Sequence, residues 1–189
     1  MCERSRLKSI TKCIDNAGGN AAGMVITLDI ASKSVITSIP EPGAGSSTIT
    51  ENIVMVEDTR TAAEVSASSP ADPIPGVFSE FEFSEIGLAY SGAEEGEAED
   101  GNLVHTVTGI ITKMNPLKSY ILEGTRGGLE HIVRFIDRNG NKWLIGDNNE
   151  GAKITVVPQT NDRNGYTLTI TWRASRLLYA YTGAIALQA

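Results

Sequence analysis

HIVRFIDRNGNKWLI, residues 131–145, places an Asn-Gly pair between two apolar runs. The same tetrapeptide, Asp-Arg-Asn-Gly, recurs at residues 162–165. Asn-Gly between strand-like runs is a strong hairpin signal, because a type I′ turn needs positive φ at both central residues. The sequence therefore predicts a β-meander, with strands over 131–136, 142–145, 154–157 and 166–172.

The last of these strands has the clearest alternation. Four apolar residues alternate with three threonines and an arginine: Tyr166, Leu168, Ile170 and Trp172 against Thr167, Thr169, Thr171 and Arg173. Because successive strand residues point to opposite faces, one face is predicted to be buried and the other to carry a threonine ladder. A slip of one residue would place Trp172 in water, so the pattern specifies the register.

Length and composition favour one mainly β domain. The chain has 189 residues, frequent glycine (19 residues) and few aromatics (6%), a combination typical of loop-rich β proteins. No apolar run approaches the roughly 20 residues that span a bilayer, and no apolar segment follows the charged N-terminus as in a secretory signal. We expect Cys2 and Cys13 to be reduced thiols, with a disulfide between them as the alternative.

The charge is strongly polarised along the chain. Residues 51–100 contain 13 of the 23 acidic residues and one base, Arg60, which is 1 − 13 = −12. Residues 1–50 sum to 5 − 4 = +1 and residues 101–189 to 10 − 6 = +4. This split is consistent with a solvated acidic loop, with head-to-tail complementarity between copies of the protein, or with a surface that repels a polyanion.

Composition shifts divide the chain into an N-terminal arm, 1–22, and a single β domain, 23–189. Within the domain, the runs 24–30 and 33–39 predict a hairpin around Ala31-Ser32, and a further strand is expected over 52–56. Residues 57–76 are predicted to be a long loop, either a lid or an arm that orders on a neighbouring copy. A second, acidic loop is expected at about 91–101.

The middle of the domain predicts two strands and one helix. In the strand 77–84, Val77, Phe81 and Phe83 share one face and Phe78 lies on the other. After a strand over 102–114, Asn115 and Pro116 form a helix start that leads to about Glu123. An apolar stripe of Leu117, Tyr120, Ile121 and Leu122 would pack this helix on the sheet. The tail after Arg176 could add a last strand, paired locally or with another subunit.

The sequence contains no signature of a catalytic or cofactor site, so we expect no enzyme, no metal and no cofactor. His105 and His131 lie in predicted strands, where a hydrogen-bonded core histidine is the simplest interpretation. The glycines of 124–128 follow a helix instead of opening one, which argues against a phosphate cradle. Asp147-Asn148-Asn149-Glu150 with Asp162 could bind Ca²⁺, but Asp and Asn also stabilise turns through their own backbone.

The two turn motifs resemble those of a known family. The run 132–146, with Asp137-Arg138-Asn139-Gly140-Asn141-Lys142-Trp143 followed by Gly146, and the run 162–170, which begins Asp-Arg-Asn-Gly-Tyr-Thr, resemble bacteriophage tail tube (major tail) proteins. Cys13 to Gly19 and the pair Phe81 and Phe83 are also similar to motifs of that family. The resemblance covers about two thirds of the chain and is clearest over 129–172, whereas the Ala/Ser/Pro loop at 57–76 has no counterpart.

The resemblance implies a two-sheet β-sandwich or barrel-like fold with one flanking helix. It also implies a virion structural protein of the phage tail, assembled in the host cytoplasm, whose copies form rings, hexameric in the family, that stack into a tube. DNA would pass through the lumen without specific binding, other tail proteins would be partners, and no membrane is involved. Acidic residues of 51–100 are expected either to line the channel or to meet basic residues of the next ring.

Two other classes remain open. A head–tail completion, collar or capsid decoration protein would use the same turn-rich β fold, because fold alone does not decide function. A carbohydrate- or receptor-binding module would need exposed aromatic residues on a concave face, whereas most aromatics here alternate as core residues do. Oligomerisation separates these classes, since a tube protein forms rings or polymers and a binding module stays small.

Overall fold

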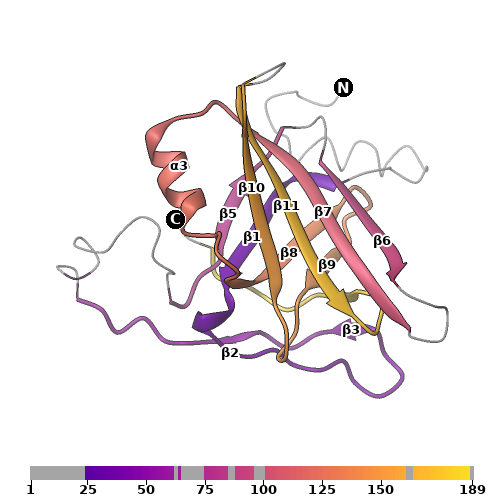
Figure 1. The fold of residues 1–189 in the computed structure, drawn as a ribbon. Coiled ribbons are helices and arrows are strands. Elements are labelled where there is room, and N and C mark those ends of the chain that lie inside the picture. Colours follow the sequence, from indigo (N-terminus) through magenta and orange to yellow (C-terminus); the bar gives the residue numbers. More distant parts are fainter. Residues whose placement is uncertain are drawn as a thin grey trace, which may run out of the picture.

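The computed structural model is mainly β, as the sequence predicts, and describes residues 24–61, 64, 75–84, 88–95, 101–160 and 164–187 (Figure 1). A 10-stranded mixed sheet and a 2-stranded sheet account for its strands. The strands are β1 (Met24–Ser32), β2 (Ile36–Ser38), β3 (Thr48–Ile49), β4 (Val54–Met55), β5 (Ser79–Glu82), β6 (Ala89–Glu95), β7 (Asn102–Thr112), β8 (Glu130–Asp137), β9 (Lys142–Ile145), β10 (Ala152–Gln159), β11 (Gly165–Ala174) and β12 (Tyr179–Tyr181). The helices are a 3-10 turn, Lys33–Val35, and α3, Pro116–Glu123.

The large sheet has two arms. The front arm has the order β10-β11-β7-β6, and the back arm has the order β5-β1-β8-β9. β12 and β3 continue the sheet beyond β9 and belong to the layer that covers the back arm. The arms are joined where Ala152 and Lys153 of β10 pair with His131 and Glu130 of β8. On the other side, the amide of Ser84, just after β5, donates to the carbonyl of Ile110 on β7 at 2.7 Å. In the described residues the sheet does not close into a barrel, since β6 pairs only with β7.

Two apolar clusters define the order of the layers. The first lies between the arms and combines back-arm residues such as Leu28 and Phe135 with front-arm residues such as Leu168 and Trp172. The second lies on the other face of the back arm, where Ala31 and Ile132 are buried beneath Ile49 and Tyr181. Residues 36–56 and 179–187 supply this covering layer, and β12 pairs locally with β9 and β3. The front arm, the back arm and the covering layer therefore follow one another in that order.

The meander is confirmed, but its first turn is of another type. β8 pairs with β9, and the amide of Gly140 donates to the carbonyl of Asp137 at 3.0 Å. Gly140 has φ +87°, whereas Arg138 and Asn139 do not have positive φ. A type I turn followed by a left-handed glycine fits these values, so the predicted type I′ turn is wrong. Part of the second motif, 161–163, lies outside the described residues.

The predicted hairpin over 24–39 is also wrong. β1 is central in the back arm and pairs with β5 and β8, whereas β2 pairs with β4 in the small sheet. The separation arises at the 3-10 turn, where the hydroxyl of Ser32 accepts from the amide of Ser34. Strand patterning identified most of β1 but only part of the second strand, because Lys33–Val35 form the 3-10 turn. It cannot state which partner each strand finds, because pairing depends on contacts distant in sequence.

Helix α3 has the predicted limits and a different packing. Asn115 caps it by accepting from the amide of Lys118 at 2.7 Å, and Pro116 occupies the first turn. Of the predicted stripe, only Leu122 is buried, while Leu117 and Tyr120 are more than half exposed. The helix therefore buries Leu122, and Asn115 and Ser119 hydrogen-bond the hydroxyl of the core residue Tyr166. The predicted apolar stripe is wrong for Leu117 and Tyr120.

Three further boundaries differ from the expectation. The strand expected over 52–56 is only β4, and the strand over 102–114 ends at Thr112, where Lys113 adopts φ +64°. β6 extends to Glu95, so the first part of the expected acidic loop is strand, and residues 96–100 lie outside the described residues. In the expected loop 57–76, Glu64 is helical and exchanges hydrogen bonds with Thr61 as in a capping box.

Candidate functional site

The front arm carries two lateral edges without backbone partners in the part of the chain that the structure describes. On one side, β6 pairs with β7 and with no other strand. On the other side, β10 pairs with β11 along its length, but its outer edge meets β8 only through Ala152 and Lys153. Residues 154–159 of β10 therefore present an open edge. Open edges are templates for pairing with another chain, and proteins usually protect them.

Among the described residues, the edge of β6 has no protection beyond its two glutamates, Glu94 and Glu95. Its residues are Ala-Tyr-Ser-Gly-Ala-Glu-Glu, with no lysine and no proline, and all except Tyr90 are exposed. Small side chains leave the backbone groups accessible to an incoming strand. The edge of β10 carries one proline, Pro158, near its end. Such a long, accessible strand edge is unusual in a protein that remains monomeric.

The two edges have opposite directions. β10 is antiparallel to β11, β11 to β7 and β7 to β6. Three reversals make β6 antiparallel to β10. When copies are related by rotation about an axis parallel to these strands, β6 of one copy meets β10 of the next in the antiparallel sense, and the sheet continues across the boundary.

The outward face of the front arm is rich in threonine, and we call it the threonine face. Its residues lie in register across the strands: Lys153, Thr171, Thr106 and Ser91 in one row; Thr155, Thr169, Thr108 and Ala89 in the next; Val157, Thr167 and Ile110 in the third. The threonine ladder predicted for 166–172 is thus confirmed on β11, and β7 and β10 extend it. Threonine is β-branched, which suits it to the surface of a strand, and the hydroxyl of Thr167 is buried without a hydrogen-bond partner.

Charges occur only at one end of the threonine face, among the described residues. Arg173 donates to both carboxylate oxygens of Glu95, at 2.7 and 3.1 Å, across the end of the arm. The hydrogen bond from Arg173 lowers the pKa of Glu95, so the carboxylate stays ionised and compensates the guanidinium. Lys153 is the remaining cation of this face. The rest of the face is polar and uncharged or weakly apolar.

Beneath this face, an aromatic stack fixes the arm to the core. The ring of His105 lies 5.2 Å from Trp172 and 6.1 Å from Tyr90. Its Nε2 is 2.9 Å from the carbonyl of Arg176, and its Nδ1 is 2.9 Å from the hydroxyl of Tyr90. A carbonyl only accepts, so Nε2 carries the proton and Nδ1 accepts from Tyr90. This confirms the prediction of a hydrogen-bonded core histidine.

His131 differs from His105. It is buried where β8 meets β1 and β10, and its Nδ1 atom lacks a hydrogen-bond partner. Burial lowers the pKa of its imidazole. Nothing around it resembles a ligand site, and no group of three or more acidic, histidine or cysteine side chains converges in the described part of the chain.

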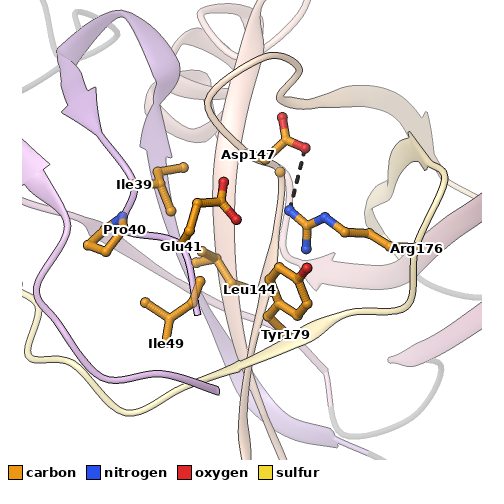
Figure 2. Close-up of a pocket in the computed structure, with 9 residues that line it drawn as sticks. Ile39, Pro40, Glu41, Ile49, Leu144, Asp147, Arg176 and Tyr179 are labelled. Atoms are coloured by element: carbon orange, nitrogen blue, oxygen red, sulfur yellow. Dashed lines mark hydrogen bonds and ion pairs between the residues drawn. The ribbon is translucent and has the colours of Figure 1, made fainter. Parts of the chain in front are cut away.

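A small pocket lies where the covering layer meets β9 and the loop that follows it (Figure 2). Arg176 points into it, stacks 3.8 Å above the ring of Tyr179 and reaches Asp147 at 3.4 Å. Glu41 and Ile39 form the facing wall. The pocket has room for about one water molecule. Sequence reasoning missed this cluster because Arg176 and Asp147 are 29 residues apart.

The side chains of Asp147 and Asn148, considered above as Ca²⁺ ligands, form hydrogen bonds within the protein instead. One oxygen of Asp147 accepts from the amides of Asn149 and Glu150, each at 2.8 Å, and the other receives Arg176. The side chain of Asn148 bonds both the amide and the carbonyl of Ile39. These residues stabilise a turn and attach it to the covering layer. Asp162 lies outside the described residues.

The first Asp-Arg-Asn-Gly turn and the glycines after α3 have structural roles. Asp137 accepts from the amides of Asn139 and Asn141 and from Trp143 Nε1, which explains an aspartate at this position without a ligand. The glycines 127 and 128 have positive φ and open surroundings, as in a loop that only connects. Cys2 and Cys13 lie outside the described residues.

Comparison with protein-family models, with curated proteins and with solved structures gives no match. In the described residues, no helix is long and apolar enough to cross a membrane. The two open edges lie on either side of the threonine face.

Proposed function

We propose that this protein is a virion structural subunit, a tail tube protein whose copies join into rings through their front arms. The observation that carries the proposal is the pair of open edges on β6 and β10, which run in opposite directions on one arm. Head-to-tail contacts of this kind generate rings when the rotation closes. The turn motifs that resemble tail tube proteins support the same assignment. In this view the fold is a tail-tube variant of a sandwich, with the front and back arms as its two layers.

The arrangement of the edges favours a ring over other uses of the same fold. Each copy contributes an even number of strands to the shared sheet, so antiparallel pairing is preserved at every junction. A carbohydrate-binding module would show exposed aromatics on a concave face, whereas Trp172, Phe78 and Tyr181 are almost completely buried. A completion, collar or decoration protein remains the alternative, and its solution state would differ from that of a tube protein.

The test is electron microscopy of the purified full-length protein together with its mass from light scattering. Rings or stacked tubes with a central hole are the expected result. A monodisperse monomer over a wide concentration range would contradict the proposal and favour a decoration or completion role. Both measurements are repeated at several salt concentrations, because charged contacts between copies weaken as the salt concentration rises.

Proline substitutions then test the edge itself. Successive N–H groups of a strand point to opposite sides, so one of the variants Ala93→Pro and Glu94→Pro removes an outward donor of β6 and the other a donor to β7. We expect the variant that keeps its far-ultraviolet circular dichroism to lose ring formation. Ala44→Pro, in the exposed loop before β3, is the matched control and should still form rings. Rings from a folded β6 variant would exclude pairing through this edge.

A further inference from the structure

We propose that Asn139 is a site of spontaneous covalent modification, at which the Asn139-Gly140 pair loses ammonia and becomes a mixture of aspartate and isoaspartate. The chain has two Asn-Gly pairs, and both lie in the same tetrapeptide, Asp-Arg-Asn-Gly. The two pairs have different surroundings in the fold, so only the first reacts at an appreciable rate in the folded protein. This reaction is independent of the assembly proposed above.

The reaction is an internal substitution at the side-chain amide of Asn139. The backbone nitrogen of Gly140 gives its proton to base and attacks Cγ of Asn139, which forms a new N–C bond. The C–N bond of the side-chain amide breaks, and its nitrogen leaves as ammonia after taking up a proton. Water then opens the resulting succinimide ring at one carbonyl to give aspartate, or at the other to give isoaspartate. Glycine favours the attack because it has no Cβ to obstruct it, and asparagine is among the thermolabile residues.

The first pair lies in an exposed turn at the tip of the β8–β9 hairpin. Asn139 and Gly140 are both exposed, and nothing lies within 4 Å of a Cβ built on Gly140. The amide of Gly140 donates to the carbonyl of Asp137 at 3.0 Å, and the amide of Asn139 donates to Asp137 Oδ1 at 2.9 Å. Both bonds are local to the turn. A local opening therefore releases the Gly140 nitrogen for attack without separating β8 from β9.

The second pair is fixed between strands. Gly165 is buried and pairs with β10 on one side and with β7 on the other. A Cβ built on it would collide with the carbonyl oxygen of Ile111. The carbonyl of Asn164 accepts from the amide of Lys113 at 2.7 Å. Attack on Asn164 requires this peptide unit to rotate and so to leave both neighbouring strands, an opening populated on the order of 10⁻³ or less in a typical folded domain.

Conversion of Asn139 changes the charge and the backbone path of the turn. Either product replaces a neutral amide with a carboxylate two residues after Asp137, and added charge acts on its neighbours as in other charge-changing modifications. In isoaspartate the main chain also passes through Cβ, which lengthens the segment between Asp137 and Gly140. The hydrogen bonds from the two turn amides to Asp137 then cannot both keep their present lengths.

Peptide mapping tests the proposal. The purified full-length protein is incubated at mildly alkaline pH, sampled over several weeks and digested at acid pH. Mass spectrometry then measures asparagine, aspartate and isoaspartate at positions 139 and 164. We expect conversion at 139 to be more than about tenfold faster than at 164 in the folded protein. The same incubation in urea is the matched control, and there the two rates should become similar because the tetrapeptides are identical.

Two variants give a second measurement on the intact protein. Glutamine keeps a side-chain amide but would have to close a larger ring, which slows the reaction. Asn139→Gln should therefore remove most of the mass gain of the folded protein, whereas Asn164→Gln should leave it unchanged. Equal loss of the mass gain in both variants would overturn the inference.

The wild-type peptide map decides the question by itself if either variant fails to fold. Similar rates at the two positions in the folded protein, or a faster rate at 164, would contradict the proposal. An Asn139 that converts in urea but stays intact in the folded protein would do the same, because the turn would then protect it.

Discussion

Arg134 and Asp29 form an ion pair that is almost completely enclosed by the protein. Arg134 Nη2 lies 2.6 Å and Nε 2.8 Å from Asp29 Oδ2, and both side chains are less than a tenth exposed. The two residues face each other across β8 and β1, in the register that also pairs Val133 with Ile30. The pair lies on the face of the back arm that the covering layer buries. It therefore joins the centre of the back arm at a place where unpaired charge would be costly.

Removal of one partner is predicted to destabilise the protein strongly. Asp29→Asn leaves the guanidinium of Arg134 buried without its counter-ion, which typically costs about 3–5 kcal/mol. Urea unfolding followed by tryptophan fluorescence measures the change. The double variant Asp29→Leu/Arg134→Met should recover much of the loss, because an apolar pair of similar volume avoids desolvation of charge.

The matched control is the exposed pair of Arg60 and Asp58, which has a similar contact distance of 2.7 Å. Asp58→Asn should leave the midpoint of unfolding unchanged, since water replaces the lost contact. Equal effects of Asp29→Asn and Asp58→Asn would show that burial does not determine the strength of these pairs.

Stability is predicted to fall as the pH drops from 7 to 5 because of His131. Burial lowers the pKa of the His131 imidazole below its usual value of 6.5, so the unfolded chain binds its proton first. Stability rises with pH wherever the unfolded state holds more protons, and so it declines with acid from about pH 6.5 downward. Thermal unfolding at closely spaced pH values measures this decline.

His131→Leu should flatten the dependence between pH 7 and 5, because an aliphatic side chain has no proton to gain. The carboxylates of Asp137 and Glu130 have pKa values lowered by their hydrogen bonds, which for Asp137 outweigh the opposing effect of burial. Their contribution to stability disappears only at lower pH. An unchanged decline above pH 5 in the leucine variant would assign the effect to another group.

Gly165 is predicted to tolerate no side chain. An added Cβ would lie 2.4 Å from the carbonyl oxygen of Ile111 on the neighbouring strand. Gly165→Ala should therefore force β11 and β7 apart and destabilise the protein by more than about 1 kcal/mol. Gly43→Ala is the control, since nothing lies within 4 Å of its Cβ position. Chemical unfolding of the two variants side by side measures the difference.

The hydrogen bond from Tyr90 to His105 is predicted to stabilise the folded protein. Tyr90→Phe keeps the ring but leaves the Nδ1 atom of His105 buried without a donor, which costs about 1–3 kcal/mol.

Burial also raises the pKa of the Tyr90 phenol above 10.0. Above pH 10 the phenol ionises more readily in the unfolded chain than in the folded protein, which lowers the free energy of unfolding. Thermal unfolding should therefore show a larger loss of stability above pH 10 for wild type than for the phenylalanine variant.

Local sequence patterns determined most of the strands, the limits of the helix and many of the buried residues, but neither β6 nor the mostly exposed stripe of α3. The alternation from Tyr166 to Trp172 specified both the register of β11 and its threonine ladder, because strand side chains have a period of two. Asn115 and Pro116 specified the start of α3 in the same local way, through a cap and a fixed φ. These features depend on neighbours within a few residues and are readable without coordinates.

Only the tertiary structure decided which strands became partners and which edges stayed open. β1 left its neighbour β2 for β8, more than 90 residues away in the chain, because the larger apolar faces of β1 and β8 are buried together. The open edges of β6 and β10, the clustering of Arg176 with Asp147 and the extension of the threonine face over β7 and β10 follow from that pairing. Pairing is settled by the burial of surfaces distant in sequence, and no short pattern records it.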